Sequence, residues 1–231
     1  MQPPLIILHG ALGDARQLEP LTTPLSGVGE IHIFGFPGHG EQPMPASAFS
    51  IPLFAESLLK FIQEKEWTQV NIFGYSMGGY VALYLAKQHP NLVHRIITLA
   101  TKFHWDEPTA AGEVKMLDPD TMRAKVPAFA AVLEQRHKAG GWREVLKRTA
   151  EMMLAMGRDN PLKIADYAEI KQEVLLLLGD RDKMVGLDET LAVRNALPVA
   201  QLGILPGVPH PVEQVDTEVL SCIIRRFLNR P

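Results

Sequence analysis

The stretch QVNIFGYSMGGYVALYLAKQ, residues 69–88, predicts a strand, a sharp turn and a helix in immediate succession. The apolar run Gln69–Phe73 fits a buried strand, and Met77–Gln88 fits a helix that stops before Pro90. Between them, Gly74-Tyr75-Ser76-Met77-Gly78 is a G-x-S-x-G pattern, and it lies in the strand–turn–helix context in which this pattern is specific. This turn points the serine hydroxyl out of the sheet, as a nucleophile requires. The alternative, a flexible glycine-containing turn without a role in chemistry, fits this context less well.

Six short apolar runs recur along the chain and predict strands. They are Leu5–Leu8, Glu30–Phe36, Gln69–Phe73, Arg95–Leu99, Glu173–Leu178 and Gln201–Leu205. Several are apolar at successive positions, which is typical of strands buried on both faces. Helical patterns lie between them, so the order predicts an α/β fold with a mostly parallel sheet of about six strands and flanking helices.

Residues 101–170 interrupt this alternation and contain no convincing strand. Two helices are expected there, around Val126–Lys138 and Trp142–Met156. We interpret the segment as a helical cap inserted within one domain that spans residues 1–231. The residues predicted to line a substrate pocket are Leu12, Phe103, Trp105, Phe129, Trp142 and Met153. The alternative is that most of these side chains only pack the cap against the sheet.

A nucleophilic serine needs a base, and the base needs an acid that orients it. His210 follows the last predicted strand, so it lies at the same edge of a parallel sheet as Ser76. The alternative is an ordinary exposed loop histidine. The acid is expected after the preceding strand, where Asp182 is favoured over Asp180, which can serve the turn. The chain order is then serine, aspartate, histidine.

Acyl transfer also needs hydrogen-bond donors for the oxyanion. The first predicted strand runs into His9-Gly10-Ala11-Leu12-Gly13, a glycine-bearing turn at the same sheet edge. The backbone N–H groups of Ala11 and of Met77, the residue after the nucleophile, are the predicted donors. His9 is expected to tie this loop together rather than to act as a second base.

Composition and charge narrow the function classes. The chain has 231 residues, 46% of them apolar, with 23 Lys or Arg against 26 Asp or Glu. A net charge of −3 argues against a protein that coats nucleic acid. The single cysteine, Cys222, excludes an internal disulfide and is expected on the buried face of the last helix, with Val219, Ile223 and Phe227.

No run is long or apolar enough for a secretion signal or a membrane span, so we expect a cytoplasmic protein without a membrane partner. No histidine has metal-ligand spacing, so no metal or cofactor is expected. Between residues 123 and 163, nine Lys or Arg accompany four Asp or Glu. These cations either steer an anionic substrate or belong to solvated helix faces. The oligomeric state stays open.

Taken together, these pieces resemble the α/β-hydrolase superfamily, and among its members small bacterial carboxylesterases and the menaquinone-pathway SHCHC synthase. The matching segments are His9-Gly10, Phe36-Pro37-Gly38-His39-Gly40, Gly74–Gly79, Gly179–Asp182 and His210. The resemblance implies a capped serine hydrolase with Ser76 as nucleophile, Asp182 as acid and His210 as base. It also implies that His39 is structural.

The expected function is hydrolysis of a small-molecule carboxylic ester or thioester through an acyl-enzyme on Ser76. Two alternatives remain open. The same scaffold could act as a lyase or C–C hydrolase with the triad as base. It could also be a non-catalytic receptor that binds a small ligand.

Overall fold

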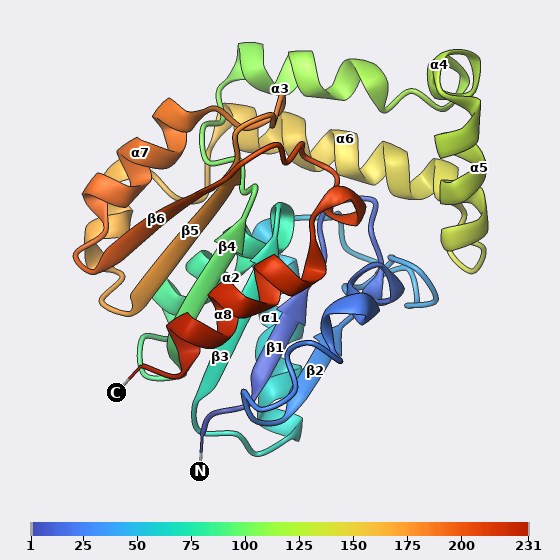
Figure 1. Ribbon diagram of the computed structural model, residues 1–231. Coiled ribbons are helices and arrows are strands. Elements are labelled where there is room, and N and C mark those ends of the chain that lie inside the picture. The colour runs from blue at the N-terminus through green and yellow to red at the C-terminus, as the bar shows by residue number, and fades with distance from the viewer. Residues whose placement is uncertain (1, 231) are drawn as a thin grey trace.

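Six parallel strands form one sheet in the order β2-β1-β3-β4-β5-β6 in the computed structural model, which describes residues 2–230 (Figure 1). The strands are β1 Leu5–Leu8, β2 Ile31–Phe34, β3 Val70–Tyr75, β4 Val93–Leu99, β5 Glu173–Gly179 and β6 Ala200–Leu205. Every neighbouring pair is parallel. The predicted sheet is confirmed, although the second strand is shorter than expected.

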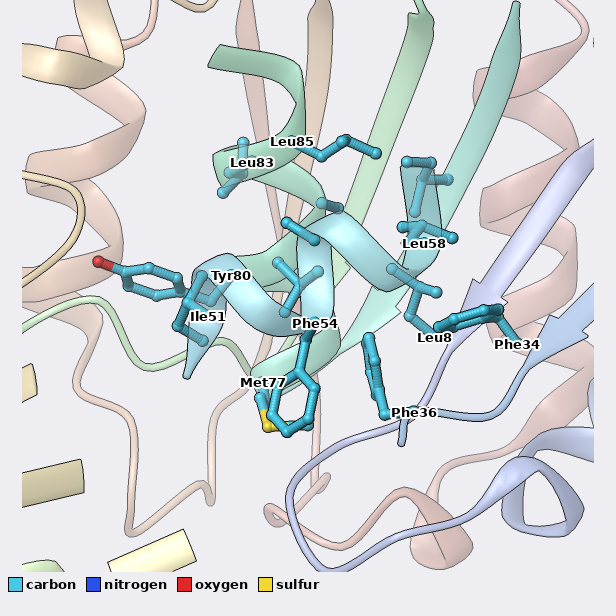
Figure 2. Packing of buried hydrophobic residues seen from close by; sticks show 14 of the residues in the cluster. Leu8, Phe34, Phe36, Ile51, Phe54, Leu58, Met77, Tyr80, Leu83 and Leu85 are labelled. Carbon is cyan, nitrogen blue, oxygen red and sulfur yellow. The ribbon is translucent and has the colours of Figure 1, made fainter. Parts of the chain in front are cut away.

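Helices cover both faces of the sheet, as the doubly apolar strands require. Helices α1 Ile51–Glu64 and α2 Met77–Gln88 lie behind the sheet in Figure 1, and α8 Thr217–Leu228 lies in front. Alternate residues of β1 join different cores: Ile6 and Leu8 pack with α1 and α2, whereas Leu5 and Ile7 pack with α8. Figure 2 shows the first core, where Leu8 lies among side chains of α1 and α2.

Helix α1 begins at a serine cap. The Ser50 side chain accepts a hydrogen bond from the Leu53 backbone N–H at 3.2 Å, and Pro52 occupies the first turn. Phe54, Leu58 and Ile62 then lie at successive turns of one face and are fully buried. The amphipathic spacing therefore fixes this helix against the sheet.

Residues 101–170 hold helices and no strand, and all of them are described by the structure. The helices are α3 Glu107–Glu113, α4 Pro119–Lys125, α5 Pro127–Arg136 and α6 Trp142–Arg158, with 3-10 turns η2 Val114–Met116 and η3 Ile164–Glu169. Figure 1 shows α3 to α6 lying across one edge of the sheet. Helices α5 and α6 match the two predicted helices, and α3 and α4 are additional.

The predicted buried face of the last helix needs correction at two positions. Cys222 is exposed, and Val219 keeps 52% of its surface exposed. Phe227 is buried as predicted, and Leu220 and Ile224, which precede it by about two turns and one turn, are buried with it. Cys222 is therefore not the inert core thiol that the sequence suggested.

Helix α7, Leu187–Ala196, packs beside β5 and β6 and completes the layer behind the sheet. None of the helices within residues 2–230 is long and apolar enough to cross a bilayer. The cytoplasmic location stays a prediction.

Candidate active site

Ser76 sits in a strained turn between β3 and α2. Its backbone has φ 51° and ψ −118°, a left-handed region that side chains rarely adopt. The flanking glycines make the turn possible, because a Cβ on Gly74 would lie 2.4 Å from the backbone carbon of Gly78. A Cβ on Gly78 would lie 2.6 Å from the carbonyl oxygen of Leu8. The turn therefore has the close packing that a nucleophile elbow requires.

Replacing Gly78 with alanine is expected to lower the free energy of unfolding by about 1–3 kcal/mol, because the methyl group meets backbone atoms that cannot rotate away. Urea unfolding followed by circular dichroism measures the change. Gly186→Ala is the matched control, since a Cβ there meets nothing closer than 3.9 Å. Equal stability of the Gly78 variant and the wild type would show that the turn is looser than described.

His210 and Asp182 form a hydrogen-bonded pair at the same sheet edge as Ser76. Asp182 follows β5 and His210 follows β6, and Nδ1 of the imidazole lies 2.8 Å from Oδ2 of the carboxylate. The Asp182 side chain is fully buried, and its Oδ1 accepts hydrogen bonds from the backbone N–H groups of Met184 and Val185 at 2.8 and 2.9 Å. Burial raises the pKa of Asp182, but the hydrogen bonds outweigh it and hold the pKa below its usual value.

Asp180, the alternative acid, has a different role. Its Oδ1 accepts a hydrogen bond of 2.6 Å from the backbone N–H of Gly207, in the turn after β6. Asp180 thus joins the two loops that carry Asp182 and His210, as expected for a residue that serves the turn.

Ser76 and His210 line one cavity. Within residues 2–230, no hydrogen bond joins the two side chains. Catalytic hydrogen bonds are often long without substrate and shorten when it binds.

Tyr75, which the sequence analysis did not single out, positions the loop of His210. Its hydroxyl donates a hydrogen bond of 3.0 Å to the His210 carbonyl, and the two rings lie 5.6 Å apart. Burial raises the pKa of Tyr75, so the hydroxyl stays protonated and keeps donating. Its place directly before Ser76 is the only sign in the sequence that it lies near the site.

The residues that carry the predicted oxyanion donors both lie close to Ser76. Ala11 lines both cavities that Ser76 lines, and Met77 follows Ser76 at the start of α2. The turn that carries Ala11 is closed by a hydrogen bond of 3.1 Å from the Gly13 N–H to the Gly10 carbonyl. The role of these two N–H groups stays a prediction.

Two side chains of the cap hold the same turn. The Leu12 carbonyl, in a residue with φ 60°, accepts hydrogen bonds from Arg136 Nη1 at 2.9 Å and His137 Nε2 at 3.0 Å. His137 Nδ1 in turn accepts from the Gly40 N–H at 2.9 Å, which fixes its neutral tautomer. The end of α5 therefore braces the loop that carries Ala11.

His9 is fully buried and structural. Its Nε2 accepts a hydrogen bond from the Phe36 N–H at 3.1 Å, and its Nδ1 donates to the Gly10 carbonyl at 2.8 Å. Burial lowers the pKa of His9 to about 4. Burial also lowers the pKa values of His39 and His137, whose rings lie 5.9 Å apart. None of the three lines either of the cavities that Ser76 lines.

Because the folded-state pKa of His9 lies below the ordinary histidine value of 6.5, the unfolded chain binds more protons at acid pH. The contribution of neutral His9 to the free energy of unfolding is fully present above pH 6.5 and is lost as the pH falls towards 4. The expected loss in the free energy of unfolding is about 3 kcal/mol, at 1.36 kcal/mol for each pKa unit. Urea unfolding between pH 7.5 and 4.5 measures it, and His9→Gln should reduce the slope. A flat profile would contradict the assignment.

A cavity of about 480 Å³ opens beside Ser76 beneath the cap. Its apolar wall consists of Leu12, Met116, Leu117, Met122, Val126, Phe129 and Met153, and its polar residues include Gln17, Glu113, Arg136 and Glu213. Ser76 also lines a smaller space of about 40 Å³, together with Met77, Trp105 and three methionines of α6. The arrangement suits an acyl or alcohol chain in the larger cavity and a small group in the other.

The predicted pocket needs correction at two positions. Leu12, Phe129 and Met153 line the larger cavity, and Trp105 lines the smaller one. Phe103 instead faces a separate cavity of about 470 Å³ between the end of α6 and α7. Trp142 is buried in the cap, where the guanidinium groups of Arg123 and Arg143 lie 5.4 and 5.2 Å from its ring.

The model of the family described as "alpha/beta hydrolase fold" matches residues 3–161, which is more than half of the chain. The chain belongs to this family. Its place in the family, together with relatives named as hydrolases and esterases, makes this α/β hydrolase an enzyme.

The hydrolase is similar to several curated proteins. It is 22% identical to 2-(acetamidomethylene)succinate hydrolase of Mesorhizobium japonicum, across 98% of this chain and 88% of that protein. It is 31% identical to the pimeloyl-[acyl-carrier protein] methyl ester esterase of Aeromonas hydrophila, across 43% of this chain and 38% of the esterase. It is 34% identical to the 2-succinyl-6-hydroxy-2,4-cyclohexadiene-1-carboxylate synthase of Enterobacter sp., across 46% of this chain and 41% of the synthase. The match to chloroplastic protein PHYLLO of Arabidopsis thaliana spans 9% of that protein.

A solved structure similar to this α/β hydrolase is the 2-hydroxy-6-oxo-6-phenylhexa-2,4-dienoate hydrolase of Rhodococcus sp. strain RHA1. The TM-score is 0.80, with 18% sequence identity, and the match covers 99% of this chain and 91% of that one. At this identity the likeness establishes the shared fold alone.

Proposed function

We propose that this α/β hydrolase cleaves a small-molecule carboxylic ester or thioester through an acyl-enzyme on Ser76. The observation that carries the proposal is the 2.8 Å contact between His210 Nδ1 and the buried Asp182 carboxylate, beside the cavity that Ser76 lines. A base that is oriented in this way, together with a serine that lines the same cavity from a strained turn, is the arrangement that acyl transfer needs.

In the proposed reaction, Ser76 Oγ attacks the substrate carbonyl while His210 Nε2 takes the hydroxyl proton. The backbone N–H groups of Ala11 and Met77 stabilise the oxyanion. Collapse breaks the bond to the alcohol or thiol, which leaves with the proton from His210. Water then attacks the acyl-enzyme, His210 again takes and returns a proton, and the carboxylic acid is released. Throughout, Asp182 holds His210 in one tautomer and stabilises the imidazolium.

A second reaction class is supported by one of the relatives. The cyclohexadiene-carboxylate synthase of Enterobacter sp. bears a name that points to chemistry other than simple ester cleavage. On this scaffold the triad would then act as base for elimination or C–C cleavage. A receptor without catalysis has no comparable support among these relatives.

Hydrolysis of p-nitrophenyl butyrate and of a butyryl thioester separates these classes. The proposal predicts turnover of at least one of them, with an initial burst of p-nitrophenol or thiol equal to the enzyme concentration if deacylation is slow. Ser76→Ala should abolish the burst and the turnover. A folded wild type that turns over neither substrate would favour the lyase or C–C hydrolase reading and overturn the ester proposal.

A further inference from the structure

Most of the positive charge of the cap lies away from the active-site cavity. Of the nine Lys and Arg between residues 123 and 163, the one that lines a cavity next to Ser76 is Arg136. Four others form ion pairs on the cap surface, Arg123 with Glu134, Arg143 with Asp120, Arg148 with Glu144 and Lys163 with Asp159. Of the two readings of these cations, the structure favours solvated helix faces.

Arg136 is already engaged by groups of the protein. Its Nη1 donates to the Leu12 carbonyl at 2.9 Å, its Nη2 lies 3.6 Å from Oε1 of Glu213, and its Nε lies 3.7 Å from Oδ1 of Asp14. Only 13% of its side-chain surface is exposed. Glu213 is held in place by Gln17, which donates to the same Oε1 at 2.8 Å. A substrate anion would have to compete with two carboxylates for this guanidinium.

Lys102, the cation beside the smaller cavity, is engaged in the same way. Its Nζ lies 3.3 Å from Glu113 and 3.8 Å from Glu189, and it donates to the Met184 carbonyl at 2.7 Å. Its side chain is 15% exposed. Lys102 thus links α3 of the cap, α7 and the loop that carries Asp182, and it does not offer a free charge to a ligand.

The charged residues on the two cavities within residues 2–230, His210 aside, are Lys102, Arg136, Glu113 and Glu213, so their formal charges cancel. The remaining wall of the larger cavity is mostly apolar, and about half of its residues come from the cap. A carboxylate entering this space would lose water without gaining an unpaired cation, which is strongly unfavourable. An alkyl chain would be stabilised by the methionine-rich wall.

We propose that the larger cavity selects an uncharged, apolar acyl chain and discriminates against an acyl chain that ends in a carboxylate. The inference rests on the proposed function, because it assigns the substrate class of the same Ser76 site. The engagement of Arg136 by Glu213 and Asp14 carries it.

Methyl octanoate and monomethyl suberate provide the test, because they differ only in a terminal methyl group against a terminal carboxylate. The methyl alcohol group is small, so the acyl chain has to occupy the larger cavity. Acid release followed in a pH-stat gives kcat/KM for each ester. We expect a ratio of about 100 in favour of the octanoate. A ratio of one, or a preference for the suberate, would overturn the inference.

Glu213→Gln is expected to lower the ratio of kcat/KM for methyl octanoate to kcat/KM for monomethyl suberate about tenfold. The substitution removes one of the two carboxylates that hold Arg136. The matched control is Glu218→Gln, an exposed glutamate in the first turn of α8, which should leave the ratio unchanged. An unchanged ratio in Glu213→Gln would contradict the role assigned to Arg136.

Binding to Ser76→Ala separates the inference from the proposed function. Binding of the two methyl esters to this variant is followed by tryptophan fluorescence, since Trp105 lies beside Ser76. Tighter binding of the octanoate by about 100-fold supports the inference even if the wild type hydrolyses neither ester, an outcome that would defeat only the proposed function. Equal or tighter binding of the suberate would overturn the inference whatever the turnover.

Discussion

Replacing His210 with alanine is expected to lower kcat for ester hydrolysis by about 10⁶-fold, the scale seen when a serine hydrolase loses its base. The reason lies in the positions of the other histidines. His9 and His137 use both ring nitrogens in hydrogen bonds, and His39 is buried against Phe49. None of them can move to Ser76 without breaking the loops that it holds.

The measurement is single-turnover release of p-nitrophenol from p-nitrophenyl butyrate by wild type and variant. His89→Ala is the control, since His89 is exposed beyond the end of α2 and should leave kcat unchanged. If His210→Ala kept more than about 1% of the wild-type rate, another group would have to be the base.

Replacing Asp182 with asparagine is expected to lower kcat by about 10⁴-fold with little change in fold. The amide keeps the size of the carboxylate and can still accept from the Met184 and Val185 N–H groups. It cannot hold a proton on His210 Nδ1 or stabilise the imidazolium as the carboxylate at 2.8 Å does. The loss should appear in kcat more than in KM, because Asp182 does not line the cavity.

Asp180→Asn is the matched control for this prediction. Asp180 lies two residues away and accepts a hydrogen bond from Gly207, which an asparagine oxygen can also accept. We therefore expect less than about a tenfold change in kcat and only a small change in stability. Comparable losses in both variants would mean that the loop, rather than the acid at position 182, controls the rate.

Much of the fold follows from local sequence pattern. The strands are continuous apolar runs because both faces of the sheet are covered, and this pattern is visible without knowledge of the partners. The turn at Ser76 can also be predicted from the sequence, because only glycine at positions 74 and 78 lets neighbouring backbone segments come this close. Parallel strands then bring Ser76, Asp182 and His210 to one edge of the sheet.

The cap could not be predicted to the same depth. Helices α3 and α4 are too short for a clear periodicity, although Asp106 and Asp118 cap them and a proline lies in each first turn. Whether an aromatic residue faces the cavity or the cap interior depends on the rotation of its helix, so Phe129 and Trp142 could not be told apart. The same uncertainty of rotation misplaced Cys222 on α8.

Contacts between distant loops are the other part that pattern does not reveal. Arg136 and His137 converge on the Leu12 carbonyl, which lies more than a hundred residues away in the chain. The hydrogen bond from Tyr75 to the His210 carbonyl is of the same kind. Each joins elements whose relative position is set only when the sheet and cap have packed.

The assignment of Ser76 as the nucleophile is tested most directly by mass spectrometry of the protein after reaction with a fluorophosphonate. We expect one adduct on the wild type, located on the peptide that contains Ser76, and no adduct on Ser76→Ala. An unlabelled wild type, or equal labelling of Ser76→Ala, would contradict it.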